Sequence, residues 1–556
     1  MNKKSMKRVL AVALAVAFVA PTGLTGQASA AKDGGSRQIN EVPVANLKQG
    51  GVFRFVQVDI CPNFNTSAIE GNLLNCSQVM NTMLPGFIYF DKNAQIQIDK
   101  NYAEDVRASR VGGKQTVTYK LNPKAKWSDG KKIGLADFVG MWNAQKKTGQ
   151  GYNITSSAGY EKIESVKKGK TDNEIVVTFS ETYPDWQPLF SALKPASLTA
   201  SPDAFNTSWK AAPLVTAGPF KFKALDKVTR TITVERDKKW WGDKPVLETI
   251  IFKALPQVAQ IDALLNGEID YMDIGNDSNA LKRARDNAKI SVLLAKAPTH
   301  EHFTFGLQNQ PVVGDVAVRQ AIMLSIDRQQ IATAIQGIVD PKVKPNNNHV
   351  FLDGVACNQD NTGNLGKRDL TAATKLLDGA GWVKGSDGIR AKGGVRLSVA
   401  LKYPSGNDNR RDTVLLATAM AKEAGIELVP TLIPTADYFG KHVLISNFEM
   451  AIFAWVGTNF PIASSPNLYK VGGPQNFGNI GNATIDGLFA KANNILDSKK
   501  RCELANQADK EVYKLVHSIT LFQRNNVVGV PKNVANFGAF GFTSIDWTKV
   551  GFTKTK

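Results

Sequence analysis

Two runs of alternating hydrophobic and polar residues lie between residues 218 and 270. After a Gly218-Pro219 turn, residues 220–222 and 231–234 alternate with the period of two that half-buried strands show. An apolar run over 249–252 predicts another strand, and helical spacing over 258–265 predicts a helix. The stretch predicts a small sheet followed by a helix and carries no catalytic pattern.

The N-terminal half shows the same mixture of patterns. Residues 51–60 alternate as a first strand, 75–84 have helical spacing, and 86–91 predict a strand that ends in a turn. Gly112-Gly113 separates two alternating runs as a hairpin turn does, and a helix is expected from residue 136. Strands and helices are therefore both present before residue 150.

Beyond residue 300 helices and strands take turns along the chain, which predicts an α/β fold with mixed sheets. Helices are expected from Val318 and over 371–380, and an amphipathic helix at 485–492. Strands are expected over 395–401, 448–455 and 522–524. The second of these is almost continuously apolar, which predicts a central position in its sheet.

Residues 1–30 have the three parts of a secretory signal: a basic start, an apolar run over 9–20 and the small-residue site Ala28-Ser29-Ala30. The run is too short to span a bilayer. No cysteine lies near residue 30, so we expect no lipid anchor there. The prediction is an exported protein, periplasmic or associated with the cell wall, with a flexible polar leader over 31–50.

The length and charge of the chain indicate how many lobes it has and which partners it can bind. A chain of 556 residues, even without a 30-residue signal, is too long for a single core, so two or more lobes are expected. The formal charge of +19 is spread along the chain without a dense basic tract or a nucleic-acid motif. We therefore expect no nucleic-acid partner, at most weak attraction to anionic wall polymers or headgroups, and a monomer.

Four cysteines in an exported chain predict two disulfides. Sequence allows three pairings. The favoured one joins Cys61 to Cys76 and Cys357 to Cys502, because the first pair then closes a short loop, worth about 3 kcal/mol in the chain-entropy model. No CxxC spacing supports a redox or metal pair instead.

Enzyme motifs are missing from the sequence. None of the histidines lies in HExxH, and no GxSxG, P-loop or paired-carboxylate pattern is present. His300 and His302 would share one side of a strand as a possible metal pair, although a strand edge at a domain border is favoured. The tryptophans are favoured as core packing over sugar stacking. We expect no enzyme, no cofactor and no metal; a hydrolase with a dispersed site stays as an alternative.

Several short motifs resemble those of the large bacterial solute-binding proteins of the peptide/nickel class, which serve ATP-driven importers. They run in the family's order and include Gly218-Pro219, Glu235-Arg236, Trp240-Trp241-Gly242, Lys244-Pro245, Gly267-Glu268-Ile269-Asp270, Asn101-Tyr102-Ala103-Glu104, Trp127-Ser128-Asp129-Gly130, Ala136-Asp137-Phe138 and Ile326-Asp327-Arg328. The resemblance implies a two-lobed periplasmic-binding-protein fold of the large peptide binders (class C), with a two-strand hinge.

The resemblance also implies how the chain is divided. Lobe I would combine residues 51–75, 215–299 and 526–556, with an inserted subdomain over 76–214. Lobe II would span 300–525. A ligand captured between the lobes would be delivered to a membrane permease of an ABC transporter. The implied ligand is an oligopeptide or peptide-like molecule; a specific metabolite, a sugar or a metallophore is the alternative.

In the resembled family the strand ending near Trp455 lines the cleft, and an extended peptide adds to it through main-chain hydrogen bonds. The matching residues are Ala454, Trp455, Val456, Gly457, Thr458 and Asn459. Trp455 is expected to form a cleft wall rather than a core plug, and Gly457 to allow close approach of another backbone.

One position departs from the family. Thr458 stands where peptide binders carry an aspartate for the ligand's α-ammonium group, and a hydroxyl lacks the charge for that bond. Asp59 could replace it. Further expected cleft residues are Cys61 and Asn63 after the first strand, Lys402, Tyr403, Asn407 and Arg410 after the 395–401 strand, and Asn476 and Phe477 in a Gly-rich loop. A cation among them could hold a ligand carboxylate.

Overall fold

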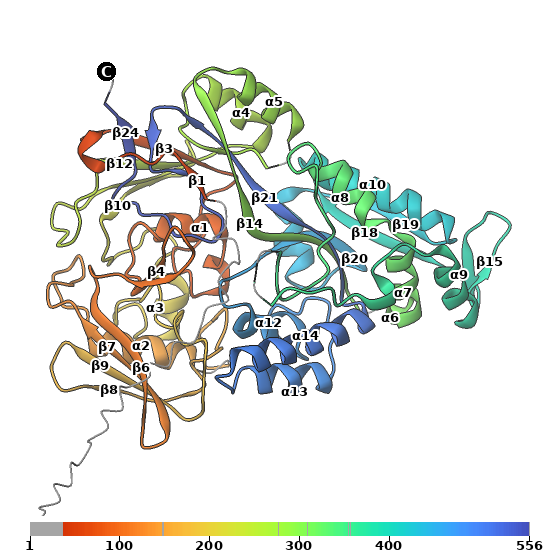
Figure 1. Cartoon of the computed structure of the whole chain (residues 1–556), viewed down its shortest axis with the longest axis horizontal. Coiled ribbons are helices and arrows are strands. Elements are labelled where there is room, and N and C mark those ends of the chain that lie inside the picture. Colours follow the sequence, from red (N-terminus) through yellow and green to blue (C-terminus); the bar gives the residue numbers. More distant parts are fainter. Residues whose placement is uncertain are drawn as a thin grey trace, which may run out of the picture.

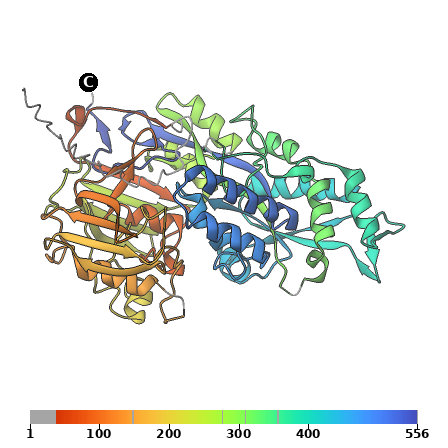
Figure 2. The ribbon, with the colours of Figure 1, turned by 60° about the horizontal axis from the view of Figure 1, so that its bottom comes forward.

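The computed structural model describes residues 37–146, 149–275, 277–308, 310–353, 355 and 357–554. The predicted signal peptide, residues 1–30, lies outside these ranges. Figures 1 and 2 show an elongated molecule with two halves, one built mainly from the first 290 residues and one mainly from the chain beyond residue 300. Two long strands, β14 and β21, run from one half into the other.

The first half contains a four-stranded sheet in the order β10-β11-β12-β3. Its strands are β10 (Phe220–Asp226), β11 (Thr231–Arg236), β12 (Thr249–Ala254) and β3 (Val52–Gln57), with β12 and β3 parallel. Alternation puts Ile232, Val234 and Ile250 in the core, each fully buried. The helix α4 (Gln257–Leu265) follows, so the sheet and helix predicted from this stretch are confirmed.

A second sheet of the first half is antiparallel throughout, in the order β6-β7-β9-β8. Gly112 and Gly113 form the turn between its first two strands, and both have positive φ, which glycine adopts without steric cost. The elements of this region are α1 (Leu74–Met80), β4 (Ile88–Phe90), β5 (Ile96–Ile98), β6 (Ala103–Val111), β7 (Lys114–Leu121), α2 (Leu135–Gln145), β8 (Ile163–Lys168), β9 (Glu174–Phe179) and α3 (Pro202–Thr207).

The second half is built on a mixed six-stranded sheet in the order β13-β21-β14-β20-β18-β19. Its strands are β13 (Met272–Asp273), β14 (Ile290–Phe305), β18 (Ser398–Pro404), β19 (Glu427–Ile433), β20 (Met450–Val456) and β21 (Ser518–Pro531). The surrounding helices are α6 (Pro311–Gly314), α7 (Val316–Ser325), α8 (Arg328–Gln336), α9 (Leu370–Gly379), α10 (Asp408–Glu423), α11 (Thr435–Asp437), the π-helix Tyr438–Val443, α12 (Pro461–Tyr469), α13 (Ala483–Ala492) and α14 (Ser498–Leu515). The helix α5 (Ser278–Asp286) packs in the core of the first half.

Small strand pairs complete the fold, and they overturn one prediction. Residues 37–50 are ordered rather than a flexible leader: β1 (Gln38–Ile39) pairs with β23 (Gly538–Ala539), and β2 (Leu47–Lys48) pairs with β24 (Gly551–Thr553). Main-chain hydrogen bonds to the C-terminal strands order this segment, whatever its polar composition. The other short strands are β15 (Val383–Lys384), β16 (Arg390–Lys392), β17 (Val395–Arg396) and β22 (Val534–Ala535).

The two long strands take part in two separate cores. Ile290 and Ala295 of β14 and Val527 and Val528 of β21 belong to the core of the first half. Phe303 and Phe305 of β14, and Ile519 and Leu521 of β21, belong to the core of the second half. Between these groups the pairing of β14 with β21 is irregular, from Lys296 to His300. The irregularity marks where one core ends and the next begins.

Two strand predictions need correction. The expected strand 395–401 is split, because Val395 is 51% exposed in the small strand β17 while Leu397, Val399 and Leu401 are buried. His300 and His302 do lie on one side of a strand, as predicted, but β14 is a central strand with partners on both sides rather than an edge.

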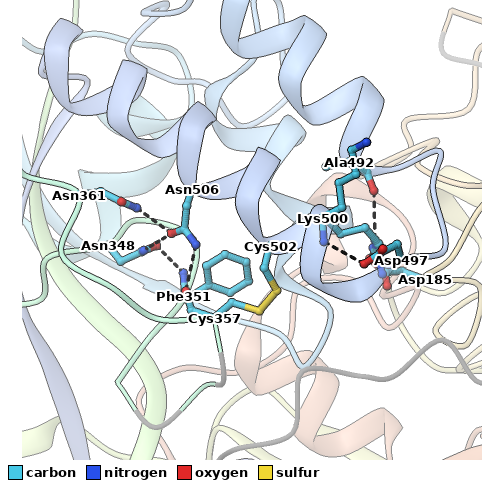
Figure 3. The surroundings of a disulfide bond; sticks show 11 residues. Asp185, Asn348, Phe351, Cys357, Asn361, Ala492, Asp497, Lys500, Cys502 and Asn506 are labelled. Carbon is cyan, nitrogen blue, oxygen red and sulfur yellow. Dashed lines mark hydrogen bonds and ion pairs between the residues drawn. A yellow bond between two sulfur atoms is a disulfide. The ribbon is translucent and has the colours of Figure 1, made fainter.

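The four cysteines form the favoured disulfides, Cys61–Cys76 and Cys357–Cys502. Figure 3 shows the second one at the start of α14, beside a network in which Asn506 bonds Asn348 and Asn361. The neighbouring Arg501 forms an ion pair with Asp185 of the antiparallel-sheet region, and the two side chains are only 4% and 6% exposed. This buried pair joins the helices of the second half to the first half.

Replacing Asp185 with alanine should leave the Arg501 guanidinium buried without its counter-charge. We expect the free energy of unfolding to fall by about 3 kcal/mol, because breaking a buried pair costs more than the pair itself contributes. The double variant Asp185→Ala/Arg501→Met should recover most of this loss. Denaturant unfolding of the three proteins measures both changes; equal losses in the single and double variants would contradict the assignment.

Candidate functional site

A cleft with a volume of about 2580 Å³ lies between the two halves of the molecule. From the first half it is lined by the segment 55–62 after β3 and by Leu73, Leu74 and Tyr89. From the second half it is lined by residues 404–407, Asn409, Arg410, Tyr438, Phe439, Ala454 and Val456, and by Arg524 of β21. Residues from both halves would therefore surround a molecule in this space.

The strand β20 borders the cleft with half of one edge unpaired. Its partner β18 pairs with it only at Met450 and Ala451, whereas β14 pairs along its whole length, from Met450 to Val456. Beyond Ala451 the two parallel strands diverge, and the Tyr438 hydroxyl donates to Ile452 O (2.7 Å) and Lys402 O (3.1 Å) in the gap. Past Ala451, no strand of the described chain pairs with this edge of β20, opposite to the one that β14 occupies.

The direction of the free main-chain groups follows from strand geometry. The Gly457 N–H donates to Pro298 O on the β14 side, whereas Ile452 O is directed to the β18 side. Since main-chain groups alternate sides along a strand, Ala454 and Val456 direct their N–H and C=O groups to the open side. The same two residues line the cleft. Together they offer two donors and two acceptors to an extended ligand.

Side chains on β14 and β20 are sorted onto two faces of the sheet. Thr299 lies opposite Val456 and Glu301 opposite Ala454, so these four residues share one face of the sheet. Thr299, Ala454 and Val456 line the cleft floor, and Glu301 is buried just beneath it. His300 lies opposite Trp455 and His302 opposite Phe453, so these residues share the other face. The floor therefore combines one buried carboxylate with small or aliphatic side chains.

Glu301 forms ion pairs with two arginines beneath the floor of the cleft, and Arg410 also donates hydrogen bonds to it. Arg410, in the first turn of α10, lies 3.1 Å from Glu301 Oε1, and Arg524 of β21 lies 2.6 Å from the same oxygen. Burial raises the pKa of Glu301, but Arg410 and Arg524 outweigh it and leave the pKa below its ordinary value. These three side chains carry two positive charges and one negative charge, and a second carboxylate, Asp273, lines the cleft and interacts electrostatically with Arg524. The group can attract an anionic part of a ligand.

The first-half wall is partly charged and partly apolar. Asp59 lines the cleft and is 65% exposed, but its carboxylate is 2.6 Å from Arg230 and is thus already paired. Cys61 also lines the cleft, with its sulfur in the disulfide to Cys76. Val58 and Leu74 line it with 58% and 61% of their surface exposed. This wall offers apolar contact to a ligand.

Five predicted cleft residues do not line the cleft. Asn63 is buried and donates to Asn206 O. Lys402 donates to Asn447 O, and Tyr403 packs against the core of the second half. Asn476 is buried and donates to Lys470 O and Ile480 O, while Phe477 stacks on Trp455. The polar side chains among these residues donate hydrogen bonds to main-chain carbonyl groups of the protein, which explains their presence without a ligand.

The turn after β20 also differs from the expectation. The backbone close to Gly457 is that of Pro298 in the protein itself, which would lie 3.2 Å from an added Cβ. The Thr458 hydroxyl accepts from the Phe460 N–H (3.1 Å), and Asn459 donates to Phe542 O. These three residues border a small side cavity next to the cleft rather than the cleft itself.

The expectation that Trp455 forms a wall of the cleft is wrong. Its ring lies on the opposite face of β20, stacked on His302 at 5.9 Å and on Phe477 at 5.7 Å. The alternation of side chains along the strand gives the cleft positions to Ala454 and Val456. Of the predicted residues, the structure thus brings Asp59, Cys61, Asn407, Arg410, Ala454 and Val456 together around one cleft.

The described ranges contain no candidate metal site and no candidate membrane-spanning helix. No group of three or more His, Cys, Asp or Glu side chains there is arranged to hold a metal ion. No helix in the same residues is both long and apolar enough to cross a bilayer. His300 and His302, with ring centroids 5.5 Å apart, are buried on the side of β14 away from the cleft.

Sequence reasoning missed Glu301, which is buried beneath the cleft floor, and several lining residues, among them Arg524, Tyr438 and Phe439. A charged residue inside an otherwise apolar strand was the available signal for the first two, since such a charge needs a partner once buried. Tyr438 and Phe439 gave no signal, because their π-helix has no recognisable sequence pattern.

Replacing Glu301 with glutamine should leave Arg410 and Arg524 without a counter-charge. We expect about 2 kcal/mol less stability at pH 7. The folded-state pKa of Glu301 lies below its unfolded value of 4.5. The carboxylate therefore stabilises the fold fully above pH 4.5, and this stabilisation is lost as the pH falls through the folded-state pKa. The two proteins should therefore converge in urea unfolding once the pH has fallen through the folded-state pKa of Glu301, below 4.5. The exposed, arginine-paired Glu427 is a matched control, and Glu427→Gln should cost less than about 1 kcal/mol.

Comparison of the chain with known proteins connects this cleft to a family. The model for "Bacterial extracellular solute-binding proteins, family 5 Middle" matches residues 102–477. The oligopeptide-binding protein OppA of Mycobacterium tuberculosis (strain ATCC 25618 / H37Rv) is 33% identical over 524 residues, which cover 94% of this chain and 88% of OppA.

Solved structures share the whole fold. A periplasmic EDTA-binding protein, EppA, superposes with a TM-score of 0.84 at 21% identity, covering 93% of this chain and 99% of EppA. The oligopeptide-binding protein AppA of Bacillus subtilis, solved with a nonapeptide, gives a TM-score of 0.80 at 19% identity, covering 91% of this chain and all of AppA. Such structures are two-lobed periplasmic binding proteins, so the predicted fold class is confirmed. The chain belongs to family 5 of the bacterial extracellular solute-binding proteins.

Proposed function

We propose that this protein captures oligopeptides in the inter-lobe cleft and delivers them to the membrane permease of an ABC importer. The open edge of β20 carries the proposal, because Ala454 and Val456 direct unpaired main-chain groups into the cleft. Every peptide can pair with such an edge through its own backbone. The relationship to OppA and AppA, named as oligopeptide-binding proteins, supports the same ligand class.

The ligand would be recognised mainly through its backbone rather than through a free amino terminus. Thr458 lacks a charge and is bonded to the Phe460 N–H, and Asp59 is paired with Arg230. The net positive group of Arg410, Glu301 and Arg524 would attract a carboxylate of the ligand. A cleft of about 2580 Å³ is large enough for several residues together with water.

The same charge group favours a second candidate, a small anionic metabolite or chelate. EppA is named as an EDTA-binding protein, and another structural neighbour was solved with Ni(L-His), so the fold also occurs around small polar ligands. Native mass spectrometry of protein purified without denaturation separates the two. A set of peptides with mixed sequences supports the peptide receptor; one defined small anion supports the alternative.

Lobe boundaries, export and lack of catalysis are further parts of the proposal. Two separate cores that meet at β14 and β21 support lobes divided as 51–75, 215–299 and 526–556 against 300–525, with 76–214 inserted. The two long strands would act as the hinge on which the lobes close. We propose an exported protein without a lipid anchor at residue 30 that releases its ligand unchanged.

Replacing Val456 with proline should weaken peptide binding at least tenfold, since it removes one donor of the open edge and crowds the approaching backbone. The fold should survive, because this N–H serves no strand of the protein. The measurement is the fraction of a random pentapeptide pool retained in native mass spectrometry. Val456→Ala keeps the N–H and should bind like the parent. Equal binding by both variants would contradict strand addition.

A further inference from the structure

The antiparallel-sheet region of the first half takes no part in the ligand cleft. None of the described residues between 103 and 190 lines it, although this stretch contains β6, β7, α2, β8 and β9. Figures 1 and 2 both place the region beside the helices α12, α13 and α14 of the second half. A part of the molecule that stays clear of the ligand but lies against the opposite half can act on the movement of the halves instead.

Polar contacts connect this region to each of the three helices. They join Ser156 Oγ to Asn467 Oδ1 of α12 (3.3 Å), Lys162 Nζ to Asn493 O at the end of α13 (3.4 Å) and Asp185 to Arg501 of α14. The residues of the first half come from the loop before β8 and the loop after β9, and the last pair is buried. The contact therefore extends over the whole helical group, so the helices cannot shift against the region without breaking it.

Apolar side chains of each half are buried in the core of the other. Ala94, in the turn between β4 and β5, and Phe542 belong to the core around α13 and α14. Phe460 and Ala463, at the start of α12, belong to the core of the first half. The Phe460 ring lies 6.0 Å from the ring of Phe90. Each half therefore contributes two side chains to the core of the other, and these side chains would meet water if the halves separated.

The apolar contacts supply most of the attraction between the halves, whereas the polar contacts fix how they fit. Separating Asp185 from Arg501 returns both charges to water, so the hydration that they regain offsets much of the lost pairing. Exposing a buried phenylalanine has no such compensation and shifts an equilibrium about tenfold or more. Phe460 and Phe542 therefore favour contact between the halves whether or not a ligand is present.

We propose that the inserted subdomain is a clasp that holds the two halves closed in the absence of a ligand. The clasp consists of Ala94, Ser156, Lys162 and Asp185 on the first half and Phe460, Asn467, Asn493 and Arg501 on the second. None of these residues lines the cleft. The inference rests on the proposed hinge but not on a peptide ligand. It makes the closed form the resting state, and opening of the clasp then limits how fast a ligand enters and leaves.

Crosslinking through two new cysteines measures closure directly. In the double variant Ser156→Cys/Asn467→Cys the new thiols are the only free ones, because the four native cysteines form two disulfides. The sample is the full chain, shown by native mass spectrometry to carry no ligand. A short bismaleimide should join the two thiols completely, as followed by intact mass, because the closed form places them side by side. Modification of each thiol singly, without joining, would overturn the proposal.

Ala94→Asp tests the clasp itself. The new carboxylate would be buried against apolar side chains in the closed form only, and burying an unpaired charge is costly. Aspartate tolerates the positive φ of this position (55°). Added to the cysteine pair, the substitution should slow crosslinking at least tenfold and raise the radius of gyration in small-angle scattering. Ala94→Gly is the matched control, because it fits the same φ without a charge and should behave as the parent.

Equal crosslinking rates and equal radii for the aspartate and glycine variants would overturn the assigned clasp. Circular dichroism shows whether the aspartate variant is folded. If it is not, the cysteine pair alone decides, because a ligand-free protein whose radius of gyration falls on crosslinking is open at rest and contradicts the proposal. Neither measurement involves a ligand, so a failed clasp leaves the proposed peptide binding untouched, and a lack of peptide binding leaves the clasp untouched.

Discussion

The proposed recognition of the ligand depends on one strand, β20, that loses a neighbour halfway along its length. Buried main-chain polar groups need partners, and an open strand edge is a template for another chain. In β20 the first residues bond β18, Tyr438 satisfies Ile452, and the groups of Ala454 and Val456 remain directed into the cleft. A ligand backbone would complete the pairing that the protein's own sheet leaves unfinished. Because every peptide has the same backbone, such an edge would accept many sequences.

The two long strands explain how such an edge can open and close. β14 and β21 pair with each other through both halves, so neither half can move without them, yet each half keeps its own core. Their pairing is irregular between Lys296 and His300, next to the residues that form the cleft floor. A change in backbone angles there would rotate one core against the other, and contacts between the halves such as the buried Asp185–Arg501 pair would have to separate. Movement and recognition would thus be concentrated at neighbouring residues of the same strands.

Local patterns predicted the elements well, because alternation and helical spacing report directly which faces are buried. The strands at 220–222, 231–234 and 249–252 and the following helix are present, and the two disulfides join the expected cysteines. The residues of the candidate site were harder to predict from the sequence. Trp455 was predicted to form a wall of the cleft, but its position in β20 directs its ring away from the cleft. The small side chain of Ala454 faces the cleft instead. Partners distant in sequence, such as Glu301 with Arg410 and Arg524, follow from the fold alone.

The charges of the cleft also restrict what can bind there. The buried Glu301 is held between two arginines and the exposed Asp59 by Arg230, so both carboxylates are already paired within the protein. A cationic ligand group would have to displace an arginine from its carboxylate. That exchange costs the existing ion pair and the hydration of the incoming cation. An anionic group could approach Arg410 and Arg524 without such an exchange, although Asp273 also lines the cleft and offsets part of the charge of Arg524. The direction in which a peptide lies along β20 would therefore follow from where its carboxylate can reach these arginines, and the backbone edge alone would not decide it.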